Sequence, residues 1–299
     1  MLQDEILKLK KAKNAVILAH YYQAAEVQDV ADFVGDSLDL SRIAATTDAK
    51  IIVFCGVNFM AETAKILSPD KKVLLPVKEA KCPMAMMINA DKLKAYKESN
   101  PERIVICYVN SYADVKAMSD VCVTSSNAEK IIQRYRDKKL LYIPDKNLGL
   151  YLKEKYQLDL DVWPGFCCIH NNLKPEEVLQ TKALYPDALV LIHPEAPLAV
   201  LKQADFVGST RQIIEYAAAS LAKNFIIGTE KGILHPLRKR CPDKNFYILT
   251  EDLQCFDMKL TRLIDVFHAL RDETFEITVP EATRKLAYAA LKRMLEMSE

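Results

Sequence analysis

The chain has 299 residues, half of them hydrophobic, so it can bury substantial cores, and its length alone suggests about two domains. Its 41 basic and 40 acidic side chains nearly cancel to a net charge of +1, which gives no reason to expect a nucleic-acid or membrane partner. Because no apolar run approaches the ~18 residues of a membrane helix, and residues 1–14 lack the core of a signal peptide, we expect a cytoplasmic protein.

Short, β-rich apolar segments alternate with helical patterns from the amino terminus onward. The charged and amphipathic start predicts a surface helix. Strands are predicted, in chain order, at residues 15–19, 51–54, 73–75, 104–107, 140–143, 162–163, 189–192, 224–227 and 247–248. Helical patterns fall between them, for example at 61–67, 128–135 and 212–222. Short buried strands that alternate with helices indicate an α/β fold with parallel sheets.

A threefold repeat changes the expected number of domains. The residues that close the first strand of each repeat lie 88 (108 − 20) and 85 (193 − 108) positions apart, at His20, Tyr108 and His193. An aspartate follows each of them twelve positions later, at Asp32, Asp120 and Asp205. Several features that keep this register are typical of repeated structural units rather than of loose periodicity.

We therefore predict three similar αβα domains, each with a parallel sheet of about four strands, in a pseudo-threefold arrangement around a central site. The helical patterns at the carboxyl end of the chain are expected to pack back onto the first domain. The predicted domains are 1–82 plus 259–299, 83–168, and 169–258.

Polar residues follow the predicted strands at the end where parallel sheets bind ligands. The first strands of the three repeats lead into His20 and Tyr22, Tyr108 and Asn110, and His193 and Glu195. The repeat also aligns three hydroxyl residues just before helical patterns, Ser37, Ser125 and Thr210. Each hydroxyl can act as an N-cap, and a helix N-terminus can hold an anion, although ordinary helix caps would look the same. Three anion-binding helix N-termini around one axis predict a cavity for a substrate with several carboxylate or phosphate groups.

The eight cysteines of a chain without an export signal should be reduced thiols that can bind metal. One of them stands near the end of each repeat, at Cys82, Cys167 and Cys255. Three thiolates from three domains could hold a [4Fe-4S] cluster and leave its fourth iron open as a Lewis acid. The spacing alone favours equally a closed zinc site with a fourth ligand such as His170.

Several stretches, in order along nearly the whole chain, match one enzyme family. They are AHYYQAAEVQDVADFVGDSLDLSR from Ala19, CGVNFMAETAKIL from Cys55, CPMA from Cys82, YVNSYADVKAMSDVCVTSSNA from Tyr108, PDKNLG from Pro144, WPGFCCIH from Trp163, HPE from His193, GST from Gly208, GTEKGILH from Gly228 and CFDMK from Cys255. In these stretches the chain resembles the quinolinate synthase A family. The resemblance implies that iminoaspartate and dihydroxyacetone phosphate condense to quinolinate in NAD biosynthesis, with release of phosphate and water. The enzyme that supplies iminoaspartate is then a candidate partner.

The resemblance favours an iron–sulfur cluster over zinc. It implies that the [4Fe-4S] cluster is held by Cys82, Cys167 and Cys255. The family motif G-x-C-x-x-H falls on Gly165, Cys167 and His170. Cys167, and not its neighbour Cys168, is therefore the expected ligand.

The resemblance also implies roles for the polar residues. It places in the active site His20, Tyr22, Tyr108, Asn110, His193 and Glu195. Glu195 is the expected general base, with a pKa that burial raises toward the working pH, while the tyrosines and histidines polarise carbonyl and hydroxyl groups. Substrate carboxylates are expected at Ser37 and Ser125, and a phosphate or a further carboxylate at Ser209 and Thr210.

Two positions depart from the family pattern. Asn58 stands where many relatives have histidine or aspartate, so we expect no catalytic role for it. Arg211 follows the GST stretch, where it would either add charge near the anion site or face solvent. Two other functions share some of these features. One is an iron–sulfur hydro-lyase of another hydroxy-acid, which would not need both substrates, and the other is a non-enzymatic cluster-based sensor.

Overall fold

In the computed structural model, which describes residues 2–299, the chain forms three four-stranded parallel sheets with the same strand order. The first contains β1 (Ala15–His20), β2 (Phe33–Gly35), β3 (Ile51–Cys55) and β4 (Lys72–Leu74) in the order β2-β1-β3-β4. The second contains β5 (Ile104–Tyr108), β6 (Val121–Val123), β7 (Leu140–Ile143) and β8 (Leu160–Val162) in the order β6-β5-β7-β8. The third contains β9 (Leu189–Ile192), β10 (Phe206–Val207), β11 (Asn224–Gly228) and β12 (Asn245–Ile248) in the order β10-β9-β11-β12. The predicted α/β fold with three similar units is confirmed.

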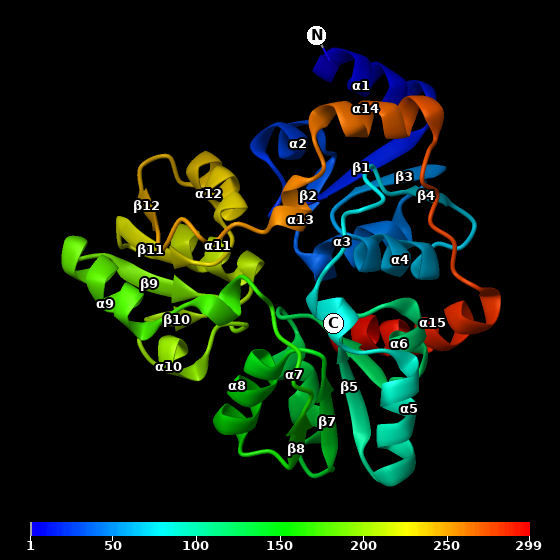
Figure 1. The fold of residues 1–299 in the computed structure, drawn as a ribbon. Coiled ribbons are helices and arrows are strands. Elements are labelled where there is room, and N and C mark those ends of the chain that lie inside the picture. The colour runs from blue at the N-terminus through cyan, green and yellow to red at the C-terminus, as the bar shows by residue number, and fades with distance from the viewer. Residues whose placement is uncertain (1) are drawn as a thin grey trace.

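The helices of each unit lie around its sheet, and the three units surround a common centre (Figure 1). The first unit has α1 (Leu2–Ala12), α2 (Ala25–Val30), α3 (Ser37–Thr46) and α4 (Asn58–Leu67). The second has α5 (Ala90–Ser99), α6 (Ala113–Ala117), α7 (Ala128–Ile132) and α8 (Lys146–Tyr156). The third has α9 (Pro175–Leu184), α10 (Leu198–Leu201), α11 (Thr210–Ala219) and α12 (Leu234–Arg240). The carboxyl-terminal segment adds α13 (Phe256–Lys259), α14 (Leu263–Asp272) and α15 (Glu281–Met297).

The central strands are hydrophobic throughout because both of their faces are covered. In β1, Val16 and Leu18 belong to one buried cluster, whereas Ile17 and Ala19 belong to another on the opposite face. This burial on both sides explains why apolar runs, rather than alternating patterns, mark these strands in the sequence. The edge strands β2, β6 and β10 have two or three residues each, which is too few for a pattern to predict.

The three repeat aspartates occupy equivalent positions. Each lies 15 residues beyond a backbone N–H of the first strand of its unit and accepts that N–H with a carboxylate oxygen. The pairs are Ile17 N to Asp32 at 2.8 Å, Val105 N to Asp120 at 2.8 Å, and Val190 N to Asp205 at 2.7 Å. In return, the backbone N–H of each aspartate donates to the carbonyl of the same strand residue at 2.9, 3.1 and 2.9 Å. The sequence repeat therefore reflects a structural repeat.

The terminal helices correct one expectation. Helix α14 packs on α1 and on β3 of the first unit. Helix α15 instead packs mainly against α6 and β6 of the second unit, with a smaller contact with α4. Its buried residues Ala287, Ala290, Leu291 and Met294 belong to the core cluster that joins the first two units. The expectation that this helix packs back onto the first unit is therefore wrong.

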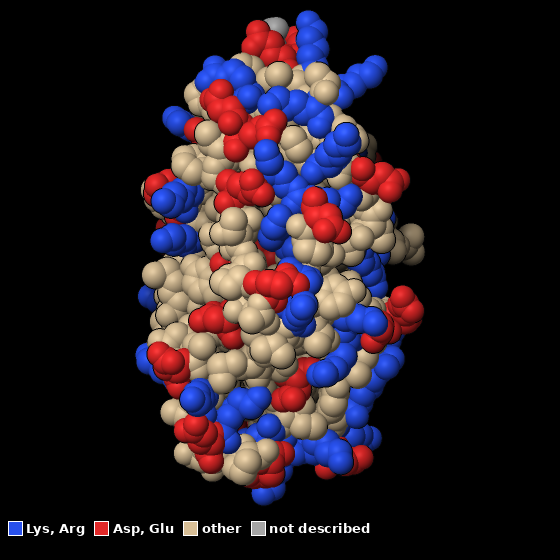
Figure 2. All heavy atoms as spheres, turned by 90° about the vertical axis from the view of Figure 1, so that its right-hand side faces the viewer, with Lys and Arg blue, Asp and Glu red and all other residues tan. Residues whose placement is uncertain are grey.

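Charged side chains of both signs are interspersed on the face that Figure 2 shows, in keeping with the near-zero net charge. Within residues 2–299, none of the helices is both long and apolar enough to span a bilayer.

Candidate active site

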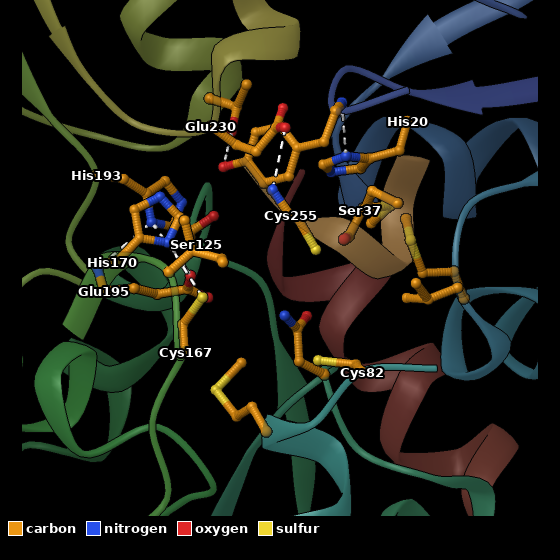
Figure 3. Close-up of a pocket in the computed structure, with 18 of the residues that line it drawn as sticks. His20, Ser37, Cys82, Ser125, Cys167, His170, His193, Glu195, Glu230 and Cys255 are labelled. Carbon is orange, nitrogen blue, oxygen red and sulfur yellow. Dashed lines mark hydrogen bonds and ion pairs between the residues drawn. The ribbon is translucent and has the colours of Figure 1, made fainter. Parts of the chain in front are cut away.

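A cavity lies where the carboxyl ends of the three sheets meet, and side chains from all three units line it (Figure 3). Among the residues predicted for the site, those that line it are His20, Tyr22, Ser37, Tyr108, Asn110, Ser125, His193, Glu195, Thr210, Cys82, Cys167 and Cys255. Ser209 is fully buried behind the cavity, where its hydroxyl accepts the N–H of Gln212 at 3.2 Å as the N-cap of α11. Ser209 therefore caps α11, and its substrate contact stays a prediction.

The three aligned hydroxyls are not the helix caps that the sequence predicted, because Asp36, Asn127 and Ser209 hold the cap positions of α3, α7 and α11. Asp36 caps α3 and accepts the N–H groups of Leu38 and Asp39 at 3.0 Å each, so Ser37 is the first residue of the helix. Thr210 likewise follows its cap. Since other side chains satisfy these helix ends, the hydroxyls of Ser37 and Thr210 are available to the cavity that they line.

Hydrogen bonds from Ser126 to two helix caps join the three units beside the cavity. Ser126 of the second unit donates to Asp36 of the first, and its oxygen also lies 2.7 Å from the hydroxyl oxygen of Ser209 in the third. Arg211 adds an ion pair to Asp39 of the first unit at 2.5 Å and another to Glu215 at 2.7 Å. The guanidinium of Arg211 thus links α11 to α3 while its side chain stays partly exposed to solvent.

His170 is the centre of a buried polar network on one wall of the cavity (Figure 3). Its Nδ1 lies 2.9 Å from Oε2 of Glu195 and 3.2 Å from Sγ of Cys167, while its Nε2 lies 2.9 Å from the hydroxyl of Thr229. Its ring stacks on that of His193 with 4.8 Å between centroids. The sequence suggested His170 only as a fourth zinc ligand, although the G-x-C-x-x-H spacing placed it beside Cys167.

The charge on Glu195 differs from the expectation. Burial by itself raises the pKa of this carboxyl, but the neighbouring imidazoles of His193 and His170 and a hydrogen bond from Tyr108 outweigh it and lower the pKa to about 2. Burial also lowers the pKa of His193 to about 3. In the free protein at neutral pH, Glu195 is therefore an anion beside a neutral His193, and the predicted rise of its pKa is wrong for this state.

The two cavity tyrosines remain protonated hydrogen-bond donors at neutral pH. Burial raises the pKa of Tyr22 and of Tyr108 well above their usual value, and the negative charge of Glu195 adds to both shifts. The hydroxyl of Tyr22 lies 2.9 Å from that of Thr210 and 2.8 Å from that of Thr229. These contacts hold the phenol of Tyr22 against the third unit, while its ring also packs edge-on against His20 of β1 at 4.5 Å between centroids.

Two buried histidines predict how the stability of the metal-free protein depends on pH. Burial lowers the pKa of both His20 and His193 from 6.5 to about 3. Between these values the unfolded chain binds a proton at each position and the folded chain does not, so the free energy of unfolding falls as the pH drops below 6.5. At pH 5.5 the loss should be roughly 1.4 kcal/mol per imidazole.

Thermal denaturation of the metal-free protein from pH 7.5 to 5 would measure this dependence. His20→Gln and His193→Gln should each flatten the curve, whereas the same change at the exposed His268 should not. A melting temperature that rises as the pH falls from 6.5 would contradict the prediction.

The three repeat cysteines bring one thiol from each unit to the cavity (Figure 3). All eight cysteines, which lie within the described range, are free thiols. Burial raises the pKa of Cys255 to about 12 and the pKa values of Cys82 and Cys167 further still, so all three remain protonated unless a cation takes the place of the proton. Cys168 does not line the cavity.

A second group of candidate ligands overlaps with this set. One ligand atom each of Cys167, His170 and Glu195 lies within 4.8 Å of the others, a spacing that could hold a single metal ion. Both arrangements share Cys167, so this thiol is a candidate ligand in either case.

Comparisons with known proteins agree with this architecture. The family model described as quinolinate synthetase A protein matches residues 4–296. The chain is 53% identical over 295 residues to a quinolinate synthase from Alkaliphilus metalliredigens, which covers 98% of this chain and 97% of the relative. It is 51% identical over 298 residues to that of Caldicellulosiruptor bescii (99% and 98% covered) and 50% identical over 297 residues to that of Clostridium kluyveri (99% and 98% covered). The chain belongs to the quinolinate synthase family. It is therefore an enzyme.

Within this family member, the cavity also contains charged residues that sequence reasoning missed. Asp36, Lys81 and Glu230 line it in addition to the predicted set. Lys81 is exposed and directly precedes Cys82, whereas Glu230 is fully buried and lies 2.8 Å from the ammonium of Lys259. Glu230 belongs to the GTEKGILH stretch, which indicated the family resemblance but did not predict that Glu230 lines the cavity. Asn58 does not line the cavity.

Proposed function

We propose that this enzyme is a quinolinate synthase of NAD biosynthesis that condenses iminoaspartate with dihydroxyacetone phosphate. The observation that carries the proposal is one cavity to which three repeated units each bring a thiol and a hydroxyl. The hydroxyls suit substrates with carboxylate and phosphate groups, and the thiols suit an iron–sulfur cluster. Family membership supports the same reaction.

The residues present fit a [4Fe-4S] cluster. Cys82, Cys167 and Cys255 are free, come from three separate units and line the same cavity. Thiolates are the usual protein ligands of such clusters, and three of them leave one iron without a protein ligand. When bound, the cluster would supply a Lewis-acidic iron that can polarise a substrate oxygen.

The polar residues of this chain would bind the substrates and move protons. Ser37 and Ser125 would hold carboxylates, and Thr210 a phosphate or a further carboxylate. Tyr22 and Tyr108, which remain protonated, would donate hydrogen bonds to carbonyl and hydroxyl oxygens. His20, His193 and Asn110 would complete the polar wall around the reacting groups.

Glu195 would be the general base once substrate is bound. In the free protein its low pKa makes it a weak base. A substrate with two carboxylates adds negative charge beside it, and a like charge within about 4–6 Å raises the pKa of a carboxyl. Binding would therefore shift the pKa of Glu195 toward the working pH, where proton transfer is most effective.

The two alternative functions have less support. A sensor does not need the acid–base residues that follow the strands of all three units. A hydro-lyase of another hydroxy-acid would act on one substrate, whereas the proposed reaction consumes two. A single ion held by Cys167, His170 and Glu195 would contain no sulfide.

Anaerobic reconstitution with iron and sulfide, followed by a quinolinate assay, tests the proposal. We expect about four irons and four sulfides per chain, from the composition of the cluster, and quinolinate only when both substrates are present. Zinc or iron without sulfide in an active enzyme would favour the single-ion site. Turnover of one hydroxy-acid alone would favour the hydro-lyase.

A further inference from the structure

One backbone hydrogen bond recurs beside all three candidate cluster cysteines. In each unit, the first residue of the helix after the third strand, which in the third unit is the 3-10 helix Lys231–Ile233 before α12, donates its N–H to a carbonyl two positions before the cysteine. The pairs are Asn58 N to Ala80 O at 2.9 Å, Lys146 N to Gly165 O at 2.7 Å, and Lys231 N to Leu253 O at 2.8 Å. The donors are 88 (146 − 58) and 85 (231 − 146) positions apart, the same offsets as the strand ends. The approach to each cysteine is therefore equivalent in the three units.

The residue just before each donor is not equivalent. It is Val57 in the first unit, Asp145 in the second and Glu230 in the third. Asp145 Oδ2 accepts the backbone N–H of Cys167 at 3.1 Å, and Glu230 Oε1 accepts that of Cys255 at 3.2 Å (Figure 3 shows Glu230 and Cys255). Both carboxylates are fully buried. Val57 offers no acceptor to Cys82.

Helix capping accounts for only half of what these carboxylates do. Asp145 Oδ1 accepts the N–H of Leu148 at 2.7 Å, and Glu230 Oε2 accepts the N–H of Gly232 at 2.7 Å, so each side chain caps the helix that follows it. One oxygen suffices for a cap. In both residues the second oxygen is used for the backbone of the cysteine.

Burial raises the pKa of both carboxyls, with a further contribution from Glu195 at Asp145, and local donors oppose this shift. The Oε1 of Glu230 lies 2.8 Å from the ammonium of Lys259, which also donates to the carbonyl of Tyr22. Asp145 is surrounded by backbone N–H groups rather than by a cation. Hydrogen bonds from N–H groups stabilise a buried carboxylate, so both residues can remain in place near a negatively charged set of thiolates.

We propose that Asp145 and Glu230 are positioning residues for the cluster ligands Cys167 and Cys255, and that Cys82 is the ligand without such an anchor. The inference rests on the proposed function, because it requires a cluster at the three cysteines. The bonded N–H fixes the backbone of the cysteine and with it the position from which the sulfur reaches the cluster. Partners of this kind, behind the ligands themselves, typically change metal affinity 10- to 100-fold when they are removed.

The test uses the full chain, reconstituted anaerobically, and measures how fast a ferrous-iron chelator bleaches the cluster absorbance. Asp145→Ser keeps one oxygen for the helix cap but leaves none for Cys167. Glu230→Leu removes the acceptor for Cys255, and Glu62→Leu is the matched control, because Glu62 is a half-buried carboxylate outside the cavity that accepts the N–H of Ala113 at 2.9 Å. We expect bleaching at least about 10-fold faster in the first two variants, an altered electron paramagnetic resonance spectrum of the reduced cluster, and wild-type behaviour in the control.

Wild-type bleaching rates and spectra in Asp145→Ser and Glu230→Leu would overturn the inference while leaving the proposed function intact. If the wild-type chain takes up no iron and sulfide, both the inference and the proposed function are overturned. If circular dichroism shows that Glu230→Leu does not fold, Asp145→Ser, with its helix cap retained, decides the test alone.

Discussion

Replacement of Cys167 by alanine is expected to abolish the anaerobic absorbance of the reconstituted cluster, whereas replacement of Cys168 should preserve it. Cys167 lines the cavity and lies 3.2 Å from Nδ1 of His170, while its neighbour does not line the cavity. With two protein thiolates left, a cluster that already has one iron without a protein ligand would have two such irons and should not survive purification. The measurement is the absorbance spectrum together with iron and sulfide content per chain.

The other cysteines provide the controls for this experiment. Cys82→Ala and Cys255→Ala should lose the cluster as Cys167→Ala does, because their thiols enter the same cavity. Cys241→Ala should retain it, since this buried thiol belongs to a separate core cluster of the third unit. A protein that keeps its cluster without Cys167 and loses it without Cys168 would overturn the choice of ligand.

The repeat made the fold and much of the cavity predictable from the sequence. Parallel strands place their carboxyl ends at one edge, so His20 and Tyr108, which end their strands, and His193, which directly follows its strand, lie at the same end of their sheets. The same offsets aligned the three cysteines. The capping role of Ser209 was not predicted, because a hydroxyl in a GST stretch looks the same whether it faces a ligand or caps a helix.

Features that depend on contacts between units or between separate segments of one unit were not predictable. No periodicity in α15 indicates that its apolar face packs on α6 and β6 rather than on the first sheet. The charge of Glu195 depends on His170, which is 25 positions away (195 − 170), on the short 3-10 helix His170–Asn172 that precedes α9. Arg211 joins Asp39 across the boundary between the third and first units. The partners of α15 and Arg211 lie on another unit, and the partner of Glu195 lies on a separate segment of its own unit, so local sequence patterns predict none of these contacts.

Glu195→Gln is expected to retain the cluster and to lose roughly a hundredfold or more in kcat, the usual scale for loss of a general base. The amide keeps the shape of the side chain and can still accept one of the hydrogen bonds that Glu195 receives from His170 and Tyr108. It cannot take up a proton from the substrate. Since the cysteines do not depend on this carboxylate for ligation in the three-thiolate site, iron and sulfide content should match the wild type.

The pH dependence separates a base from a residue that only orients its neighbours. If bound substrate raises the pKa of Glu195, protonation of the carboxylate makes kcat of the wild type fall as the pH decreases through that pKa, and this acid limb should be absent in Glu195→Gln. In the free enzyme the pKa of about 2 places the corresponding limb of kcat/KM far lower. Glu62→Gln, the same substitution at a half-buried carboxylate outside the cavity, should leave rate and pH profile unchanged. Near-wild-type quinolinate formation by cluster-loaded Glu195→Gln would instead assign the proton transfers to Tyr22, Tyr108 or His193.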